Sequence, residues 1–321
     1  MTNRYLPEGC LIGTPENREL ISSLSGLERA RDTGKILEAT VLLCDSAMRL
    51  HVDLYGIEGI IEKQECLFCR EGESLKDIAI ITRVGKPVAF KVMSISYDRG
   101  KPVAMLSRRE AQIECMRNYL SDLITGDIIP TKVTHLENFG AFVDVGCGIS
   151  SLLSVDSISV SRISHPRDRL KIGDNIFTVV KTIDYENNRL FVSMKELLGT
   201  WSENASCFEV GQTVSGIIRS VESYGVFVEL APNLAGLAEL RDGTRDKEIA
   251  EVGSQVAVYI KSIIPDRMKI KLVLIDSYKG DTPMSGTKYY IDCEKTSHID
   301  SWRYSPEGAT KLVESTFSSA F

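Results

Sequence analysis

Long apolar runs are absent from this sequence. No segment approaches the roughly 18 consecutive apolar residues that a membrane-spanning helix requires, so we expect no transmembrane helix. Residues 1–20 lack a basic start followed by an apolar stretch, which argues against a secretory signal. We therefore expect a cytoplasmic protein, and its 321 residues are enough for two or three domains with cores of their own.

An excess of positive charge is absent as well. The chain has 38 Lys and Arg against 44 Asp and Glu, which gives a net charge of −6. This balance argues against a protein that binds duplex DNA by covering its phosphates with Lys and Arg. It leaves open a protein that holds single strands mainly by stacking their bases on aromatic rings.

Motifs of metal binding and catalysis are also missing. The eight cysteines are scattered along the chain, as expected of reduced thiols in a cytosolic protein. Cys66 and Cys69 have the spacing of half a zinc site, but no second Cys or His pair matches it, so a local pair of thiols is favoured. There is no Gly-rich phosphate loop, no two-metal carboxylate cluster and no Cys/His nucleophile arrangement. We expect no metal, no other cofactor and no enzymatic activity.

What the sequence does contain is an internal repeat. Residues 126–129 and 138–144 match residues 211–214 and 223–229 at a constant spacing of 85. A weaker third copy lies upstream, within residues 34–110. A period of roughly 80 to 90 residues is too long for a solenoid unit and suits a small self-contained domain.

Each copy has the pattern of a small β-domain. Val, Ile, Thr and Phe alternate with polar residues between Gly-rich or Asn-rich turns, for example at residues 185–188, which predict a hairpin turn. About five strands fit per copy, and a closed barrel would remove their exposed edges. Helices are predicted over residues 109–123 and over 15–31, where Thr14 is the N-cap and Pro15 the first helical residue. Residues 305–307 predict the start of a short C-terminal helix.

These signals predict a mainly β protein made of three tandem five-stranded barrels joined by short helices. We expect a helical extension, a degenerate first barrel domain, a linker helix, two further barrel domains and a tail. In that order their limits are residues 1–33, 34–110, 111–125, 126–200, 205–276 and 277–321.

Aromatic residues fall on the outer face of the predicted strands. Along residues 141–145 the odd positions are apolar, so Phe142 shares the opposite face with Asp144. The next copy repeats this arrangement with Phe227 and Glu229. Such rings either pack under a loop or a neighbouring domain, or form a platform on which bases stack, at about 1–3 kcal/mol per base. A second ring precedes each of them by three residues: Phe139 and Tyr224.

The same alternation places cationic side chains outward near the rings. Each of them taken alone is a solvated surface charge, but their recurrence beside the aromatics favours contacts with phosphates. The outward residues of the middle copy are Lys181, Arg189 and the further aromatic Phe191, and those of the last copy are Lys261, Lys269 and Lys271.

The combined pattern resembles the S1 RNA-binding domain, the OB-fold repeat of a bacterial small-subunit ribosomal protein. It consists of Phe-Gly-Ala-Phe-Val-Asp, then Gly-Asp, then Lys-x-Ile-Asp with Arg-Leu, and a final Ser-x-Lys. Residues 126–195 carry it strongly, residues 211–275 clearly and residues 34–110 weakly. Residues 160–169 are also similar to the short S1 homologues that have few repeats.

The resemblance implies a set of binding residues. In the middle copy it selects the rings of Phe139 and Phe142, with Asp184 and Arg189, while Ser154 stands near the family's His position. In the last copy Lys269 takes the place of the Arg, Ile264 that of the Asp, and Glu239 stands near the His position. The first copy has Met48 and His51 at the ring positions, and a surface role is favoured for that His.

The resemblance also implies the function. It predicts a protein that holds single-stranded RNA, in particular messenger RNA, and works with the small ribosomal subunit. The alternatives are an RNA-turnover or regulatory factor that is not resident on the ribosome, and a protein-interaction scaffold built from worn repeats. Because stacking should dominate in an acidic protein, we expect RNA affinity to fall from the middle copy to the last and then to the first.

Overall fold

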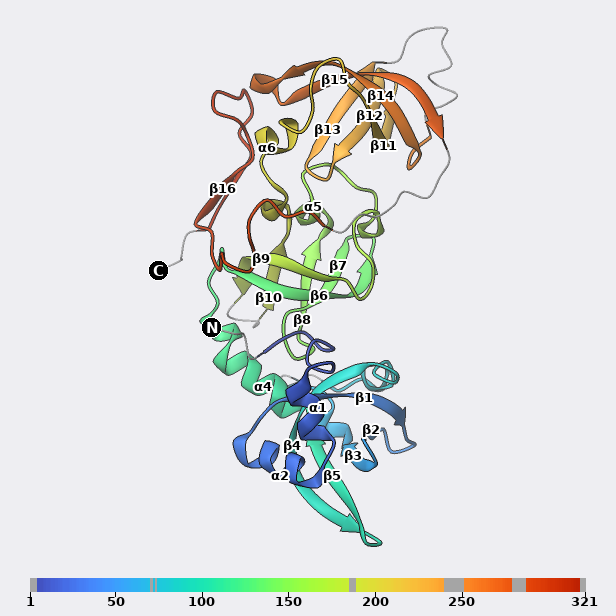
Figure 1. Cartoon of the computed structure of the whole chain (residues 1–321), viewed down its shortest axis with the longest axis vertical. Helices are drawn as coiled ribbons and strands as arrows, with labels where there is room; N and C mark the ends of the chain where they lie inside the picture. Colours follow the sequence, from blue (N-terminus) through green and yellow to red (C-terminus); the bar gives the residue numbers. More distant parts are fainter. Residues whose placement is uncertain are drawn as a thin grey trace. The chain divides into compact units, whose positions relative to one another are not determined.

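A computed structural model describes residues 5–69, 72, 74–184, 189–239, 251–278 and 287–317. These residues form three closed five-stranded barrels and a small two-stranded sheet (Figure 1). They divide into two compact units, of which the first comprises Met1–Leu123, Pro130–Lys132 and Asp144–Ser150, and the second the remainder of the chain. Among the described helices, none combines the length and the apolar character needed to cross a bilayer.

Barrel 1 confirms the prediction of about five strands for the weakest copy. Alternate residues of its second strand, Leu50, Val52 and Leu54, are buried, as expected for a strand with one face toward the barrel interior. The strand order is β1-β2-β3-β5-β4. The strands are β1 (Leu37–Cys44), β2 (Leu50–Leu54), β3 (Ile57–Ile61), β4 (Pro87–Asp98) and β5 (Lys101–Ser107).

Helices flank barrel 1. The single helix predicted over residues 15–31 is two helices, α1 (Pro15–Ile21) and α2 (Leu24–Thr33). Ser23 breaks the run, because its backbone is extended and its side chain accepts the Gly26 N–H as a new N-cap. The predicted Thr14 cap and the helix over residues 109–123 are both present, the latter as α4 (Arg108–Asn118) followed by η2 (Leu120–Asp122). The remaining elements of this region are η1 (Lys63–Glu65) and α3 (Asp77–Ile81).

Barrels 2 and 3 share the circular strand order of barrel 1, which supports their origin as repeats. The order is β10-β8-β7-β6-β9 in barrel 2 and β11-β12-β13-β15-β14 in barrel 3. The predicted turn at residues 185–188 lies outside the described residues. Barrel 2 comprises β6 (Ile128–Glu137), β7 (Gly140–Asp144), β8 (Ser150–Ser154), β9 (Asn175–Asp184) and β10 (Arg189–Ser193). Barrel 3 comprises β11 (Thr213–Glu222), β12 (Gly225–Ala231), β13 (Leu234–Glu239), β14 (Gln255–Ile264) and β15 (Lys269–Tyr278).

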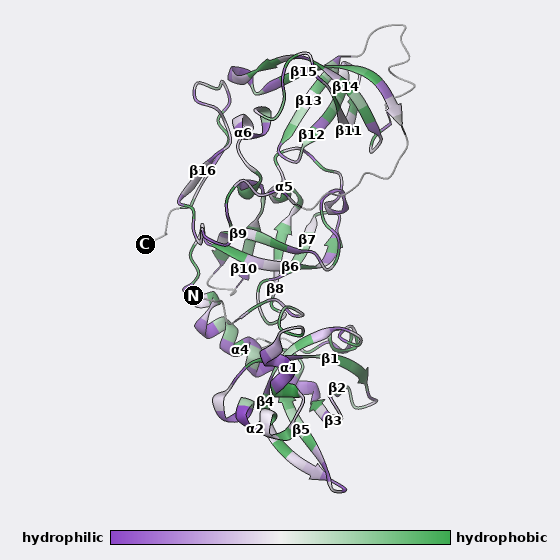
Figure 2. Ribbon diagram, viewed as in Figure 1, coloured by the Kyte–Doolittle hydropathy of each residue, from purple (hydrophilic) through white to green (hydrophobic). Residues whose placement is uncertain are grey.

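Short helices lie at the turns of barrels 2 and 3. They are α5 (Val155–Ile158), η3 (Pro166–Asp168), η4 (Lys195–Leu198), α6 (Trp201–Ala205) and η5 (Pro265–Arg267). Hydrophobic residues are concentrated in the barrel strands, while hydrophilic residues predominate on α1 and much of α4 (Figure 2). This distribution is expected if each of the three barrels has a small hydrophobic core of its own.

The tail forms a two-stranded sheet rather than the helix predicted at residues 305–307. Its strands are β16 (Ser301–Arg303) and β17 (Glu314–Thr316). The side chain of Ser305 accepts the Val313 N–H at 2.8 Å. This hydrogen bond stabilises the connection between the two strands. Trp302 and Tyr304 are buried in the core of barrel 3, so the tail is part of the folded unit.

Two acidic residues expected on the outer face with the rings are buried instead. Asp144 is 2% exposed because it accepts the backbone N–H groups of Glu8, Gly146 and Gly148. Glu229 is 5% exposed because it accepts from Arg219 at 2.7 Å and also from Arg169. Strand alternation identified the correct side of each strand, but it could not show which segments cover that side.

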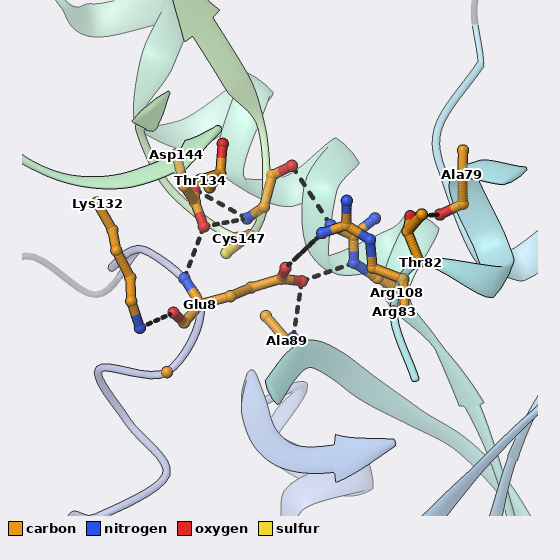
Figure 3. A network of polar contacts seen from close by, with 12 residues as sticks. Glu8, Ala79, Thr82, Arg83, Ala89, Arg108, Lys132, Thr134, Asp144 and Cys147 are labelled. Atoms are coloured by element: carbon orange, nitrogen blue, oxygen red, sulfur yellow. Dashed lines mark hydrogen bonds and ion pairs between the residues drawn. The ribbon is translucent and has the colours of Figure 1, made fainter. Parts of the chain in front are cut away.

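The first unit contains a buried ion pair at its centre (Figure 3). The carboxylate of Glu8 accepts from Arg108 Nε at 2.6 Å and from the Ala89 N–H at 3.1 Å. Arg108 also donates to the carbonyl oxygens of Cys66 and Gly148. Arg83 lies 3.7 Å from the same carboxylate. These contacts hold the N-terminal segment in one register, and loss of Glu8 would leave the buried Arg108 charge uncompensated.

A second buried carboxylate holds the same segment. Glu38 Oε2 accepts the backbone N–H groups of Gly9, Leu11 and Ile12 at 2.9–3.0 Å. These bonds favour the ionised carboxylate, but burial outweighs them and raises the pKa of Glu38 to about 7.

This pKa predicts that the stability of barrel 1 falls as pH rises. The full contribution of Glu38 is present below its usual pKa near 4.5 and is lost as pH rises through about 7, up to about 3 kcal/mol. Hydrogen exchange of β1, corrected for the intrinsic rate, should therefore show protection that decreases between pH 5 and pH 8.

Glu38→Gln is the control, since it removes the titrating group. Burial also raises the pKa of Asp144, so part of the pH dependence should remain in this variant. Protection that rises with pH, or a pH dependence unchanged by the substitution, would contradict the assignment.

Candidate nucleic-acid interface

Barrel 2 presents a pair of aromatic rings on its outside. Phe139 is 56% exposed and Phe142 is half-buried, and their ring centroids lie 6.0 Å apart at 89°, edge to face. Gly140, between them, is required by close packing, because a Cβ there would lie 2.5 Å from the carbonyl oxygen of Leu153. This close approach of β8 fixes the backbone from which both rings project.

Barrel 3 presents an equivalent pair. Tyr224 is 60% exposed and Phe227 is half-buried, with their centroids 6.3 Å apart at the same angle of 89°. The predicted outward placement of both pairs is therefore present in the structure, and one ring of each pair is more than half exposed. Their role in binding stays a prediction.

The pair in barrel 3 lies in a groove. Across the sheet, Phe227 stands opposite Leu237, and Leu237 stands beside Lys271. The groove has a volume of about 430 Å³ and contains four of the predicted site residues, Tyr224, Phe227, Lys269 and Lys271. A base could contact the rings while phosphates approach the two ammonium groups.

Arg267 also lines this groove and was missed from the sequence. It lies in η5, the turn between β14 and β15, where strand alternation gives no indication of direction. Ile264 and Glu239, the residues at the family's Asp and His positions, line the same groove. Glu239 lies 3.6 Å from Lys271, and because both are largely exposed this ion pair contributes little to stability.

The predicted residues of barrel 2 are only partly brought together. Arg189, the first residue of β10, stands opposite Asp184, the last residue of β9, and it is exposed. Phe191 is half-buried beside Leu152, the position that corresponds to Leu237 in barrel 3. These residues extend the surface, although the described contacts do not join them directly to the ring pair.

Two predicted lysines occupy equivalent places in barrels 2 and 3. Lys181 and Lys261 are the extra residues at β-bulges in β9 and β14. The ammonium group of Lys181 donates to Ser157 Oγ at 2.9 Å, so it is held against α5. Lys261 is exposed but is not among the residues that line the groove.

Barrel 1 has a different surface at the corresponding positions. His51 is held between Asp45 and Glu58, at 3.3 and 2.8 Å, and Met48 is partly buried against the core. Met48 has no ring, and the His51 side chain is only 18% exposed, so these two positions do not form a ring pair like those of barrels 2 and 3.

A further residue that the sequence did not indicate stands beside Phe142. The imidazole of His135 stacks on the Phe142 ring with centroids 6.4 Å apart and planes inclined by 28°. Alternation along β6 would have placed His135 inside the barrel after buried Val133. The structure places it outside, next to the rings.

Cys66, a member of the possible half zinc site, is buried in barrel 1. Its Sγ donates to the carbonyl oxygen of Glu62 at 3.3 Å. Within the part of the chain that the structure describes, no group of three or more His, Cys, Asp and Glu side chains is placed to hold a metal ion.

The fold and the outward rings together define a class of protein. A closed five-stranded barrel that presents aromatic rings beside cationic side chains is the arrangement of OB-fold modules for single-stranded nucleic acid. Residues 122–195, which include barrel 2, match the family model described as "S1 RNA binding domain". This segment therefore matches the S1 RNA-binding domain, as the resemblance in the sequence led us to expect.

Two similar curated proteins, from different bacteria, carry the same name. The small ribosomal subunit protein bS1 of Staphylococcus aureus (strain MRSA252) is 28% identical over 302 residues, which are 89% of this chain and 74% of that protein. The protein of the same name from Chlamydia muridarum is 28% identical over 224 residues, 68% of this chain. The match spans 38% of the Chlamydia protein's length.

Solved structures give weaker matches. A multidomain protein with nucleic acid binding domains from Streptococcus pneumoniae is 14% identical, with 75% of this chain and 73% of that chain covered and a TM-score of 0.24. A TM-score this low adds no support to the assignment of the fold.

Removing the rings of barrel 2 should weaken RNA binding without unfolding the protein. Phe139→Ala combined with Phe142→Ala should cost about 2–5 kcal/mol of binding free energy, because each stacked base contributes about 1–3 kcal/mol. Fluorescence anisotropy with an unstructured single-stranded RNA measures the change, and thermal unfolding checks the fold.

A matched control is Tyr97→Ala, which removes an exposed ring from barrel 1. It should leave RNA affinity unchanged. If the double variant unfolds while its folded fraction retains RNA affinity, the rings have a structural role, and the hypothesis that they form a stacking platform is wrong.

Proposed function

We propose that this protein is a non-enzymatic RNA-binding protein of the ribosomal S1 type, which holds single-stranded RNA on the outside of tandem OB-fold barrels. The observation that carries the proposal is the recurrence of one ring geometry, edge to face at 6.0 and 6.3 Å, in two consecutive barrels. A structural role confined to one barrel would not require the same exposed pair in both.

Stacking is the binding mechanism that suits the chain's charge. A protein with a net charge of −6 gains little from neutralising many phosphates, whereas an exposed ring binds the face of any base. Barrels 2 and 3 belong to one compact unit, so a strand that reached both would benefit from a high effective concentration at the second site.

The proposed partners are messenger RNA and the small ribosomal subunit, and the proposed location is the cytoplasm. Relatives named small ribosomal subunit protein bS1 cover 89% of this chain in one case, which supports this proposal over that of a free RNA-turnover factor. Sedimentation of the tagged chain with small subunits in a cell extract would test it, and a protein found entirely in ribosome-free fractions would favour the free factor.

The protein should distinguish single strands from duplexes. Base pairs hide the faces that the rings contact, so a single strand should bind much more tightly than a duplex of equal length. Competition between the two RNAs for the full-length protein at one fixed salt concentration measures the difference. Equal affinities would exclude stacking as the main source of binding.

The two barrels should differ in their salt dependence. The groove of barrel 3 carries Arg267, Lys269 and Lys271, so Lys269→Ala with Lys271→Ala should lower the slope of log affinity against log salt by about one to two. The double ring variant of barrel 2 should weaken binding at every salt concentration and leave the slope unchanged. Titrations between low and moderate salt separate these effects, and identical slopes for all variants would refute the assignment of the lysines to phosphates.

A further inference from the structure

We infer that His135 is a third ring of the RNA platform of barrel 2, an inference that rests on the proposed function. The family resemblance places its His near Ser154, on β8, whereas His135 lies on β6 at the opposite side of β7. The structure thus supplies an imidazole from a different strand than the sequence pattern led us to expect.

The placement of the imidazole favours contact with a base. The His135 side chain is 58% exposed, and its ring centroid lies 6.4 Å from that of Phe142, with the planes inclined by 28°. Rings in direct face-to-face contact would have closer centroids, so this separation leaves room for a base to contact both rings. Phe139 stands edge-on to Phe142, so the Phe142 ring has both Phe139 and His135 as neighbours.

A hydrogen bond favours the outward orientation of His135. Its Nε2 lies 2.8 Å from Glu137 Oε1, two residues further along the same strand. Both side chains are about half exposed, so this contact biases the ring toward that orientation without locking it. An exposed imidazole without such a partner would sample several rotamers.

The next repeat has a β-bulge at the place in its strand that corresponds to His135. In barrel 3, Ser220 stands opposite Phe227, and Arg219 is the extra residue between Ile218 and Ser220. The spacing of 85 residues aligns Ser220 with His135 and Phe227 with Phe142.

Barrel 2 has matching features in β6. Thr134 and His135 are both exposed in succession, so the alternation of the strand is interrupted there. Thr134 Oγ1 donates to the carbonyl oxygen of Phe142 at 3.0 Å, which fixes β6 beside β7 at this point. The same platform position thus holds an imidazole in barrel 2 and a serine in barrel 3.

The experiment compares two substitutions of His135 in the full-length protein. His135→Ala should weaken binding of an unstructured single-stranded RNA by roughly 5- to 30-fold, as expected for the loss of one stacking face. His135→Phe keeps a ring at that place and should remain within about 2-fold of the wild type. Both side chains are exposed, and thermal unfolding verifies that the variants fold.

The natural serine in barrel 3 allows the reverse test. In the background of Phe139→Ala and Phe142→Ala, where barrel 2 lacks its ring pair, Ser220→His should strengthen binding several-fold. Ser220→Ala in the same background is the control and should have no effect. A gain from the new imidazole would show that the position itself contributes to binding.

The outcomes separate this inference from the proposed function. If the wild type fails to bind single-stranded RNA, or the double ring variant binds as well as the wild type, the proposed function fails. If the ring pair matters but His135→Ala binds within 2-fold of the wild type, the third ring is refuted. A His135→Phe variant as weak as His135→Ala would also overturn it, because a stacking surface would then not be what His135 provides.

Discussion

Closure of a five-stranded barrel is the constraint on which the rest of this structure depends. The interior of so small a barrel is filled by alternate side chains of each strand, such as Ala141 and Val143, so the residues between them must lie outside. Phe142 and Phe227 stand outside for this reason. The same closure leaves no free sheet edge, so the proposed binding surface consists of side chains rather than unpaired backbone.

The covered part of the outer surface joins segments of the chain. Asp144 and Glu229 occupy the same place in successive repeats, two residues after the outward Phe. Each is buried by a segment that precedes its own barrel in sequence: Asp144 accepts the Glu8 N–H, and Glu229 accepts from Arg169. On the same face of a strand, the acidic residue thus binds another segment of the chain, while the Phe two residues earlier presents its ring on the outside.

The repeats have diverged in the chemistry beside the rings. Barrel 2 has His135 beside its ring pair, whereas the groove of barrel 3 has cations at Lys269, Lys271 and Arg267. In barrel 1 the histidine, His51, contacts two carboxylates. The proposed division is that stacking dominates in barrel 2 and phosphate contacts matter more in barrel 3.

The sequence by itself determined the repeat, the strand content, the capped helices and the outward direction of the ring pairs. These features depend on local periodicity and on spacing along the chain, both of which can be read directly from the sequence. It did not reveal the break at Ser23 or the extended tail around Ser305, because each depends on a hydrogen bond that competes with a continuous helix.

Only the tertiary structure decided which outward residues are accessible and which are not. Asp144 is covered by a segment more than a hundred residues away, and His135 faces outward because the alternation of its strand is interrupted at Thr134 and His135. Arg267 joins the groove from a turn that has no periodicity. Parity along a strand gives a direction relative to one sheet, whereas burial and proximity depend on parts of the chain that meet only after folding.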